Sequence, residues 1–376
     1  METLQTYIQR NRENISPVTT QEQWYGEMYH NTRAIFYDVP TMIGKKRVFA
    51  FVSYPTTAKP ANGYPAVVLI HGGNGAAFYE MSRLWADRGF VTITPDFDGK
   101  YAYSIHDRQR VNEDGGNPGY SSMNDLHEEN PWAYFSVLSA MRALDVLQSI
   151  EDVDKENLFS CGLSWGGFVQ LLLSSVETRL KGASVIYSSA FVMQSKWGQD
   201  RLSVLKSEED KKLWVDYIDP HNYLQNITHP VFFTAGADDI AFTMENRRLT
   251  AEKIPAPTYF GLRKNFPHGN FIGFEQWETC YFFMNCTRGG VVPQPEVTVK
   301  NGSVTIVAGG IQSTLSLCYT KDSLTETDVQ TWEEIPVASK EIVAKATVAI
   351  PKDATAFFVV EKGADGLVFS SNLIRV

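Results

Sequence analysis

The chain has 376 residues, of which 43% are hydrophobic and 20% charged, an ordinary globular composition that excludes a disordered or collagen-like protein. A chain of this length favours two domains over one. Because a net charge of −9 does nothing to offset the repulsion of phosphates, nucleic acid is not an expected partner. No apolar run reaches the roughly 18 residues that a membrane-spanning helix needs, so no membrane span is expected.

The N-terminal stretch METLQTYIQRNRENIS is polar. It lacks a basic start followed by an apolar stretch, so it is not expected to be a secretory signal. A signal that had been trimmed away would leave no trace, and we therefore leave localisation open between the cytoplasm and export.

The four cysteines are Cys161, Cys280, Cys286 and Cys318. They form no Cys-x-x-Cys pair and show no zinc-ligand spacing with a histidine, so we expect buried thiols. If Cys280 and Cys286 lie on one helix, six residues apart, they point to different faces, which disfavours a disulfide between them.

From about residue 35 to residue 288, short apolar runs alternate with helical patterns. The helical pattern is clearest in PWAYFSVLSAMRALDVLQSI, where large apolar residues recur at steps of three. Most of the apolar runs are too continuous for half-exposed strands. This alternation predicts an α/β fold with a doubly wound, mostly parallel sheet and helices on both faces. The predicted strands are RVFAFVSYP, AVVLIHGG, FVTITPDF, NLFSCGLS, ASVIYSS, PVFFTAG and TYFGLR.

The pattern changes after Arg288. The linker GGVVPQPEV leads into short, largely alternating segments that are rich in Val and Thr. Asn301-Gly302 predicts a tight hairpin, and residues 363–366 predict another turn. We therefore predict two domains. The first is residues 1–288, including an N-terminal extension of about residues 1–34, and the second is a small all-β, immunoglobulin-like sandwich at residues 289–376.

The predicted sandwich has no cluster of His, Cys or carboxylate side chains suited to chemistry. Its expected role is to pack on the first domain or to act as a spacer. Binding of a sugar or of a partner is the alternative.

The stretch FSCGLSWGGFVQ places Ser164 between Gly162 and Gly166, where a predicted strand ends and a predicted helix begins. A serine on such a tight turn points its oxygen outward, and the turn needs small neighbours because a Cβ would crowd the backbone. The amide of Trp165, at the start of the helix, can donate to an oxyanion. The pattern therefore predicts a nucleophile at Ser164, and a serine helix cap among glycines is the alternative.

A serine nucleophile needs a base and an acid that orients the base, and in this type of fold they follow the serine in the order acid, then histidine. The run HPVFFTAGADDIAF presents two carboxylates after a strand, and the spacing from Gly236 favours Asp239, with Asp238 as the alternate acid. His268 in PHGN is the predicted base, against the alternative of an ordinary surface-loop histidine. His71 is less favoured, because it precedes the serine and is expected to hold its own loop.

A second oxyanion donor is expected in the glycine-rich loop HGGNG, which follows a buried strand. We assign it to the backbone amide of Gly73, and less readily to that of Asn74. A phosphate-binding loop is excluded because no Gly-Lys-Ser/Thr ending follows.

Together, HGGNG, AMRALDVLQSIEDVDKENLFSCGLSWGG, GADD and PHGN resemble the α/β-hydrolase superfamily. More narrowly they resemble its dienelactone hydrolase, prolyl oligopeptidase and acetyl xylan esterase group, over residues 35–288. The resemblance implies a serine hydrolase that needs no metal or organic cofactor. In it Ser164 is the nucleophile, His268 the base and Asp239 the acid, with oxyanion amides from Trp165 and Gly73.

The substrate is less constrained by the sequence. Two inserts are candidates for shaping the pocket: the polar residues 99–131, and residues 191–224, which carry Trp197 and Trp214. The alternative is that they are surface loops and core aromatics. Polar groups beside aromatics suit a sugar ring, so the expected partner is a small-molecule or saccharide ester and the expected activity is a carbohydrate acetyl esterase. Two alternatives stay open: a serine peptidase acting on short peptides, and a noncatalytic binding protein on a hydrolase scaffold. The oligomeric state is also open.

Overall fold

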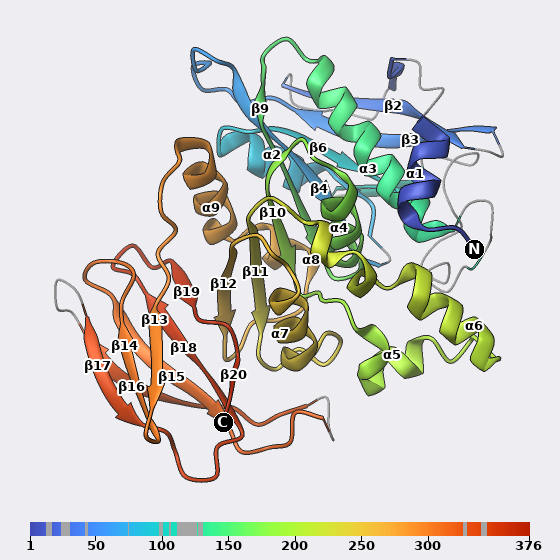
Figure 1. Cartoon of the computed structure of the whole chain (residues 1–376). Coiled ribbons are helices and arrows are strands. Elements are labelled where there is room, and N and C mark those ends of the chain that lie inside the picture. The colour runs from blue at the N-terminus through green and yellow to red at the C-terminus, as the bar shows by residue number, and fades with distance from the viewer. Residues whose placement is uncertain are drawn as a thin grey trace.

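A long twisted sheet runs through the molecule, with helices packed on both of its faces and a β-rich C-terminal portion beside it (Figure 1). The computed structural model describes residues 1–12, 17–23, 31–41, 44–73, 75–97, 101–104, 107–110, 126, 131–325, 329–339 and 344–376.

The centre of the sheet is parallel and contains six of the seven predicted strands. Each of its members pairs in parallel with its neighbours in this centre. The order is β6 (Val91–Pro95), β4 (Tyr64–Ile70), β9 (Val153–Leu163), β10 (Leu180–Ile186), β11 (Val231–Gly236) and β12 (Thr258–Arg263). The predicted α/β class with a mostly parallel central sheet is confirmed.

Antiparallel strands extend the sheet beyond β6. They are β3 (Gly44–Ser53), β2 (Thr32–Thr41) and β1 (Thr20–Gln23). Of these, β3 was predicted and β2 was not. The apolar run of β2 is interrupted by Asp38, which is nevertheless buried because its carboxylate accepts a hydrogen bond from the amide of Thr19 and faces Arg142. A separate small sheet contains β5 (Ala77–Phe78), β7 (Tyr101–Ser104) and β8 (Asp107–Arg110).

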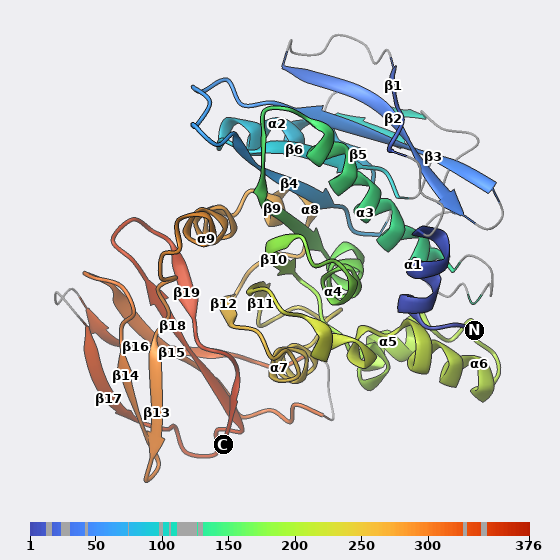
Figure 2. The same cartoon turned by 45° about the horizontal axis from the view of Figure 1, so that its top comes forward.

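The helices form one layer on each face of the sheet (Figures 1 and 2). On β4, Val68 and Ile70 belong to one hydrophobic core, and Val67 and Leu69 to the other, as the two-residue period of a strand requires. The first core is covered by α1 (Leu4–Arg12), α3 (Trp132–Ser149) and α4 (Trp165–Val176), and the second by α2 (Tyr79–Asp87) and α9 (Trp277–Arg288).

Shorter helices follow the carboxyl ends of β10, β11 and β12. They are α5 (Lys196–Arg201), α6 (Glu208–Leu213), α7 (Met244–Glu252) and α8 (Asn270–Phe274). Because parallel strands all end at the same edge of the sheet, these helices and the loops around them gather where the predicted site residues lie.

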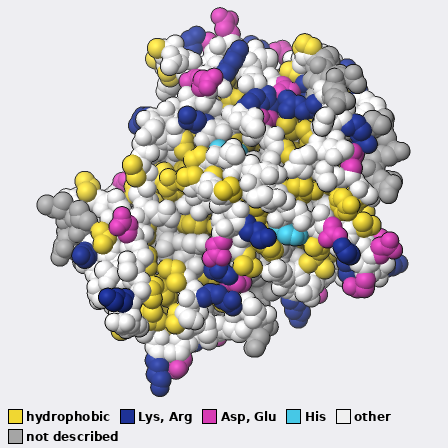
Figure 3. Space-filling view, viewed as in Figure 1, with side chains coloured by type: hydrophobic (Ala, Val, Ile, Leu, Met, Phe, Trp, Pro, Cys, Tyr) yellow, Lys and Arg dark blue, Asp and Glu magenta, His cyan; other side chains and the backbone are white. Residues whose placement is uncertain are grey.

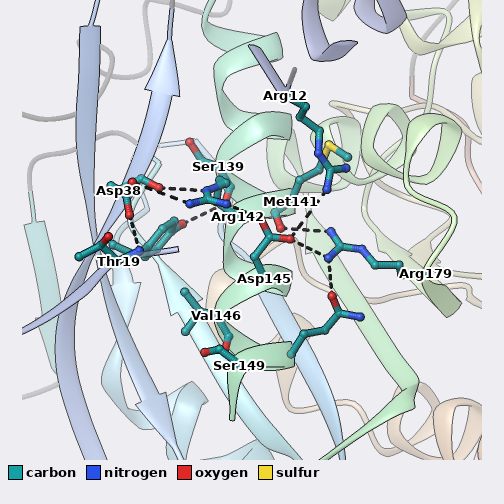
Figure 4. Close-up of polar contacts among 12 residues, drawn as sticks. Arg12, Thr19, Asp38, Ser139, Met141, Arg142, Asp145, Val146, Ser149 and Arg179 are labelled. Atoms are coloured by element: carbon teal, nitrogen blue, oxygen red, sulfur yellow. Dashed lines mark hydrogen bonds and ion pairs between the residues drawn. The ribbon is translucent and has the colours of Figure 1, made fainter. Parts of the chain in front are cut away.

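A buried ion-pair network fixes α3 against its neighbours (Figure 4). Arg142 is only 2% exposed, and its guanidinium lies between Asp145, at 2.7 Å, and Asp38, at 3.8 Å. The other oxygen of Asp145 accepts a hydrogen bond of 2.6 Å from Arg179, which lies between α4 and β10. Residues 142–145 (RALD) therefore link α3 to β2 through Asp38. They also link α3, through Arg179, to the C-terminal end of α4, the helix that follows Ser164.

The C-terminal portion consists of two β layers. One is a three-stranded sheet of β13 (Glu296–Lys300), β14 (Ser303–Val307) and β17 (Lys345–Ala349). The other contains β15 (Thr314–Thr320), β16 (Glu333–Ser339), β18 (Ala356–Lys362), β19 (Val368–Ser370) and β20 (Ile374–Arg375). Apolar side chains from both layers, including Ile306, Leu317 and Phe357, form a core of their own. The predicted all-β portion is confirmed.

The hairpin prediction at Asn301-Gly302 is also confirmed, because both residues have positive φ (50° and 71°) between the paired residues Lys300 and Ser303. In contrast, β16 was not predicted. It carries Pro336 within its span, which is tolerated because β16 is the edge strand of its layer.

The two portions of the chain are continuous with each other. Strand β19 pairs antiparallel with β12, and the Ser370 hydroxyl accepts a hydrogen bond of 2.9 Å from the amide of Leu262. Phe369 belongs to the same core as Phe232, with ring centroids 6.1 Å apart. The domain boundary at 288/289 stays a prediction. Helix α9 ends at that point, and Gly289 follows it with φ of 65°.

All four cysteines are free thiols: three are buried, and Cys286 is half-buried. Cys280 and Cys286 both lie on α9, which is the condition under which a disulfide between them was disfavoured. Burial raises the pKa of both thiols to about 11. These cysteines are therefore packing residues in the described fold.

Acidic and basic side chains are interspersed on the face shown in Figure 3, with no single large basic patch. Within the part of the chain that the structure describes, no helix is both long enough and apolar enough to span a bilayer.

Candidate active site

Ser164 occupies a strained turn between β9 and α4. Its φ of 54° and ψ of −124° lie in a region that a residue with a Cβ rarely adopts. Backbone hydrogen bonds hold this conformation: the Ser164 amide donates to the carbonyl of Ile186 (2.8 Å), and the Ser164 carbonyl accepts from Gly167 (2.9 Å). The turn presents the serine side chain at the carboxyl end of the sheet.

The glycines around Ser164 are required by close backbone contacts. A Cβ on Gly162 would lie 2.1 Å from the carbonyl oxygen of Gly166, and a Cβ on Gly166 would lie 2.3 Å from that of Ile70. No side-chain rotation relieves a collision with backbone atoms. The Gly-x-Ser-x-Gly spacing is therefore a packing requirement of this elbow.

His268 and Asp239 come together from two loops at the same end of the sheet. The distance between His268 Nδ1 and Asp239 Oδ2 is 3.2 Å, and the Asp239 side chain is 2% exposed while that of His268 is 35% exposed. The other Asp239 oxygen accepts hydrogen bonds from the amides of Ala241 (2.9 Å) and Phe242 (3.3 Å). A buried carboxylate with these donors can orient an imidazole whose opposite nitrogen is left for chemistry.

Asp238, the alternate acid, lies differently. Its Oδ1 is 3.5 Å from the amide of Phe266, and the contact with the His268 ring is made by Asp239. The geometry therefore favours Asp239 for the orienting role.

One predicted oxyanion donor, Trp165, belongs to the elbow, and the other, Gly73, lies on the loop that follows β4. Trp165 is the first residue of α4, where an amide has no carbonyl four residues earlier within the helix to bond. Gly73 lines the same cavity as Ser164. The loop is brought there by Gly72, where a Cβ would lie 2.9 Å from a Leu163 side-chain atom. Asn74, the less favoured donor, lies outside the described residues.

A cavity of about 550 Å³ joins these groups. Besides the predicted site residues, apolar and charged side chains line it, and Trp197 and Arg201 reach it from α5. Its lining is Gly73, Ser164, Trp197, Arg201, Asp238, Asp239, Ile240, Ala241, Phe266, Pro267 and His268. Among the described residues, no hydrogen bond joins Ser164 to His268, although both face this cavity. Catalytic hydrogen bonds are often long in free enzymes and shorten when substrate binds.

The family model for the dienelactone hydrolase family matches residues 51–259. This segment is more than half of the chain, and it contains the elbow and both candidate acids. The chain belongs to the dienelactone hydrolase family.

Curated relatives of this dienelactone hydrolase family member include probable dipeptidyl-peptidase 5 of Emericella nidulans, 25% identical over 174 residues, and dipeptidyl-peptidase 5 of Arthroderma otae, 25% identical over 171 residues. Each alignment covers 44% of this chain, but only 22% and 21% of the respective relatives. The chain thus matches about a fifth of the length of these peptidases.

Two solved structures share the fold of this family member. Acetyl xylan esterase 1 from Thermoanaerobacterium sp. JW/SL YS485 is 15% identical with a TM-score of 0.58, over 75% of this chain and 92% of that chain. Acetyl xylan esterase from Paenibacillus sp. R4 is 17% identical with a TM-score of 0.56, over 75% of this chain and 91% of that chain. Similarity at this identity establishes the α/β-hydrolase fold.

In this family member, His71 holds its loop in the way that the sequence suggested. It is 4% exposed, and its Nδ1 lies 2.7 Å from the carbonyl of Gly72. Its Nε2 accepts a hydrogen bond of 3.0 Å from the amide of Phe97. Because both ring nitrogens have backbone partners, His71 is poorly placed to act as a base.

Of the two inserts that are candidates for shaping the pocket, the second contributes only in part. Trp197 lines the cavity, but Trp214 is fully buried, with its ring centroid 5.8 Å from that of Phe168. Trp214 is thus a core residue, in agreement with the alternative that the aromatics of this insert belong to the core. Most of residues 99–131 lie outside the described residues.

Two residues near the site were not predicted. Tyr187 follows β10 with φ of 51°, and its ring stacks on that of His268 with centroids 4.8 Å apart. Arg247 on α7 is 1% exposed and lies 4.0 Å from the Asp239 carboxylate. No local motif marks either position, because each reaches the site through tertiary packing.

Proposed function

We propose that the chain is a serine hydrolase that cleaves carboxylic esters through Ser164, His268 and Asp239. The observation that carries the proposal is the convergence of a strained serine and an aspartate-bound histidine on one cavity. Membership of the dienelactone hydrolase family supports the hydrolase class.

In the proposed mechanism, Ser164 Oγ attacks the ester carbonyl as His268 Nε2 accepts its proton. Asp239 holds Nδ1 and stabilises the imidazolium that forms. The tetrahedral intermediate collapses as His268 returns the proton to the leaving alcohol, which leaves an acyl group on Ser164. A water molecule, deprotonated by the same imidazole, then releases the acid and restores the serine. No metal or organic cofactor takes part.

The negative charge on the carbonyl oxygen is proposed to meet the amides of Trp165 and Gly73. The helix dipole of α4 adds to the first of these donors. In other hydrolases, loss of one such donor costs about 2.7–4 kcal/mol of transition-state stabilisation. The close packing of Gly72 against Leu163 supports this assignment, because it holds the loop beside the elbow.

The proposed substrate is an acetylated carbohydrate. Trp197 offers an aromatic face in the cavity, and Arg201 and Asp238 supply polar groups beside it, a combination that suits a sugar ring with its ester. The solved structures with the same fold include two acetyl xylan esterases, whose names agree with this substrate class.

The proposal is tested with p-nitrophenyl esters of increasing acyl length, on the wild type and on Ser164→Ala. We expect the wild type to prefer acetate, and the variant to lose about 10⁴–10⁶-fold in kcat because no other group can carry the acyl intermediate. A fluorophosphonate probe should label the wild type alone. Full hydrolysis by Ser164→Ala would contradict the mechanism. A wild type that is neither labelled nor active would favour a binding protein on a hydrolase scaffold.

A serine peptidase is the second candidate, because the curated relatives are dipeptidyl-peptidases. The same triad would serve it, with a peptide amine as the leaving group. Adding dipeptidyl amides and acetylated xylo-oligosaccharides to the panel separates the candidates. The esterase proposal expects kcat/KM for the sugar ester to exceed that for every peptide amide, and the reverse order would favour the peptidase.

A further inference from the structure

Arg247 carries a buried charge next to the proposed triad. Its guanidinium is 1% exposed, donates from Nη2 to the carbonyl of Phe242 (2.8 Å) and from Nη1 to the sulfur of Met244 (3.0 Å), and lies 4.0 Å from Asp239 Oδ2. Burying a guanidinium is costly unless a counter-charge compensates for the lost water. Burial lowers the pKa of Arg247 to about 10, with Asp239 acting in the opposite direction, so the group stays charged at neutral pH.

Each oxygen of the Asp239 carboxylate has partners of its own. Oδ1 accepts hydrogen bonds from the amides of Ala241 and Phe242. Oδ2 faces His268, at 3.2 Å, and Arg247, at 4.0 Å. Arg247 thus contacts the loop at two places, the carboxylate at its start and the carbonyl of Phe242 at its end. Its charge also offsets part of the negative field that Asp239 exerts on the imidazole.

We propose that Arg247 is a positioning residue of the active site, which acts through Asp239 by fixing the loop of residues 239–242 and limiting the negative charge felt by His268. This inference rests on the proposed function. It assigns Arg247 no contact with the substrate, since Arg247 does not line the cavity.

The inference predicts a change in pH dependence. Without the positive charge, protonation of the imidazole becomes easier, so the acidic limb of the kcat/KM profile moves to higher pH. Other charged or titratable groups near Asp239 and His268 are Asp238 and Arg201, which line the same cavity, and Tyr187, whose ring stacks on the imidazole. Arg263 and Glu275 interact electrostatically with Tyr187. They are unchanged in an Arg247 variant, so the shift isolates the effect of Arg247.

The test compares Arg247→Met, which removes the charge but keeps an unbranched apolar side chain, with Arg247→Lys, which keeps the charge. The matched control is Arg248→Met. Arg248 is the next residue on α7, and it pairs with Glu245 and Glu252 instead of Asp239. For p-nitrophenyl acetate, we expect the acidic limb of Arg247→Met to rise by about 0.5–1 pH unit, with up to about tenfold lower kcat/KM at neutral pH and little change in KM. Arg247→Lys and Arg248→Met should keep the wild-type limb.

A double-mutant cycle shows whether Arg247 acts through Asp239. In the Asp239→Asn background, Arg247→Met should lower kcat/KM by less than about twofold, because the carboxylate through which Arg247 acts is gone. The inference is overturned if Arg247→Met lowers kcat/KM by the same factor in both backgrounds. It is also overturned if the acidic limb of the kcat/KM profile of Arg247→Met coincides with that of the wild type. Arg247→Gln, which retains a donor for Phe242, carries the same test if the methionine variant does not fold.

The outcome also separates this inference from the proposed function. Loss of fluorophosphonate labelling in Ser164→Ala, combined with an unshifted limb in Arg247→Met, would overturn the role of Arg247 alone. Wild-type hydrolysis by Ser164→Ala would instead overturn the proposed function.

Discussion

The two halves of the candidate active site are built in different ways. The serine elbow, residues 162–167, is held by backbone atoms: its strained turn is fixed by main-chain hydrogen bonds, and its glycines touch neighbouring carbonyls. The histidine loop, residues 264–269, is held by side chains that come from elsewhere, with Tyr187 stacked on the imidazole and Asp239 bound to it. We therefore expect the elbow to tolerate no added side-chain atom at its glycines. The histidine loop should depend instead on which side chains contact it.

The strongest test of this comparison is Gly166→Ala. The new Cβ would lie 2.3 Å from the oxygen of Ile70 and 2.4 Å from that of His71, and neither atom can move without shifting the sheet or the loop after it. We expect a loss of about 3–5 kcal/mol in the free energy of unfolding, and at least a 100-fold loss of kcat. Chemical denaturation and ester hydrolysis measure the two effects.

Gly182→Ala on the adjacent strand β10 is the matched control, because its Cβ would lie 3.4 Å from the nearest atoms, which are side-chain atoms of Cys286 and Phe282. A Gly166→Ala enzyme as stable and active as this control would contradict the view that backbone contacts define the elbow.

A buried histidine beside α4, the helix that follows the elbow, is expected to make the stability of the fold depend on pH. His229 is buried, and its Nε2 lies 3.1 Å from the hydroxyl of Ser174 on α4. Burial lowers the pKa of His229 from 6.5 to about 4, so the folded state keeps it neutral while the unfolded state binds a proton below pH 6.5. Its contribution to stability is complete above pH 6.5, and about 2–3 kcal/mol is lost as the pH falls to about 4.

His229→Gln keeps an amide donor for Ser174 but cannot titrate. The difference between the unfolding free energies of the wild type and this variant should therefore change with pH between 4 and 6.5, with the wild type losing more. Parallel stability curves would show that His229 is not the group responsible.

The smallest expected effect is on the histidine half, from Tyr187→Leu. Leucine fills part of the space but removes the aromatic stack on His268, so we expect about a tenfold drop in kcat with little change in KM. Tyr187→Phe keeps the ring and should stay within about twofold of the wild type. If both variants behave alike, the ring does not position the imidazole.

The same contrast explains what the sequence could predict. Ser164 and its glycines form a local pattern whose spacing reflects direct contacts, and six of the seven predicted strands form the parallel centre because continuous apolar runs require burial on both faces. The ordering of a carboxylate and then a histidine after the serine led to the residues that lie 3.2 Å apart in the structure. The roles of these residues stay a proposal.

What the sequence did not predict depends on contacts between distant segments. Strand β2 contains Asp38, which is buried because it faces Arg142 more than 100 positions later, and a pattern of apolar residues cannot anticipate such a partner. Tyr187 and Arg247 likewise look like ordinary strand-end and helix residues. The sequence also left open whether Trp214 lines the pocket or fills the core, and its packing against Phe168 of α4 shows that it fills the core.

The pairing of β19 with β12 has a consequence for self-association. The exposed border of a β-sheet carries unpaired backbone groups that invite a neighbouring molecule to add its own strand. Here Ser370 is paired with Phe260 and accepts a hydrogen bond from Leu262, so this part of β12 offers no free edge to a second copy. Strand addition between two copies would therefore need a different border of the sheet.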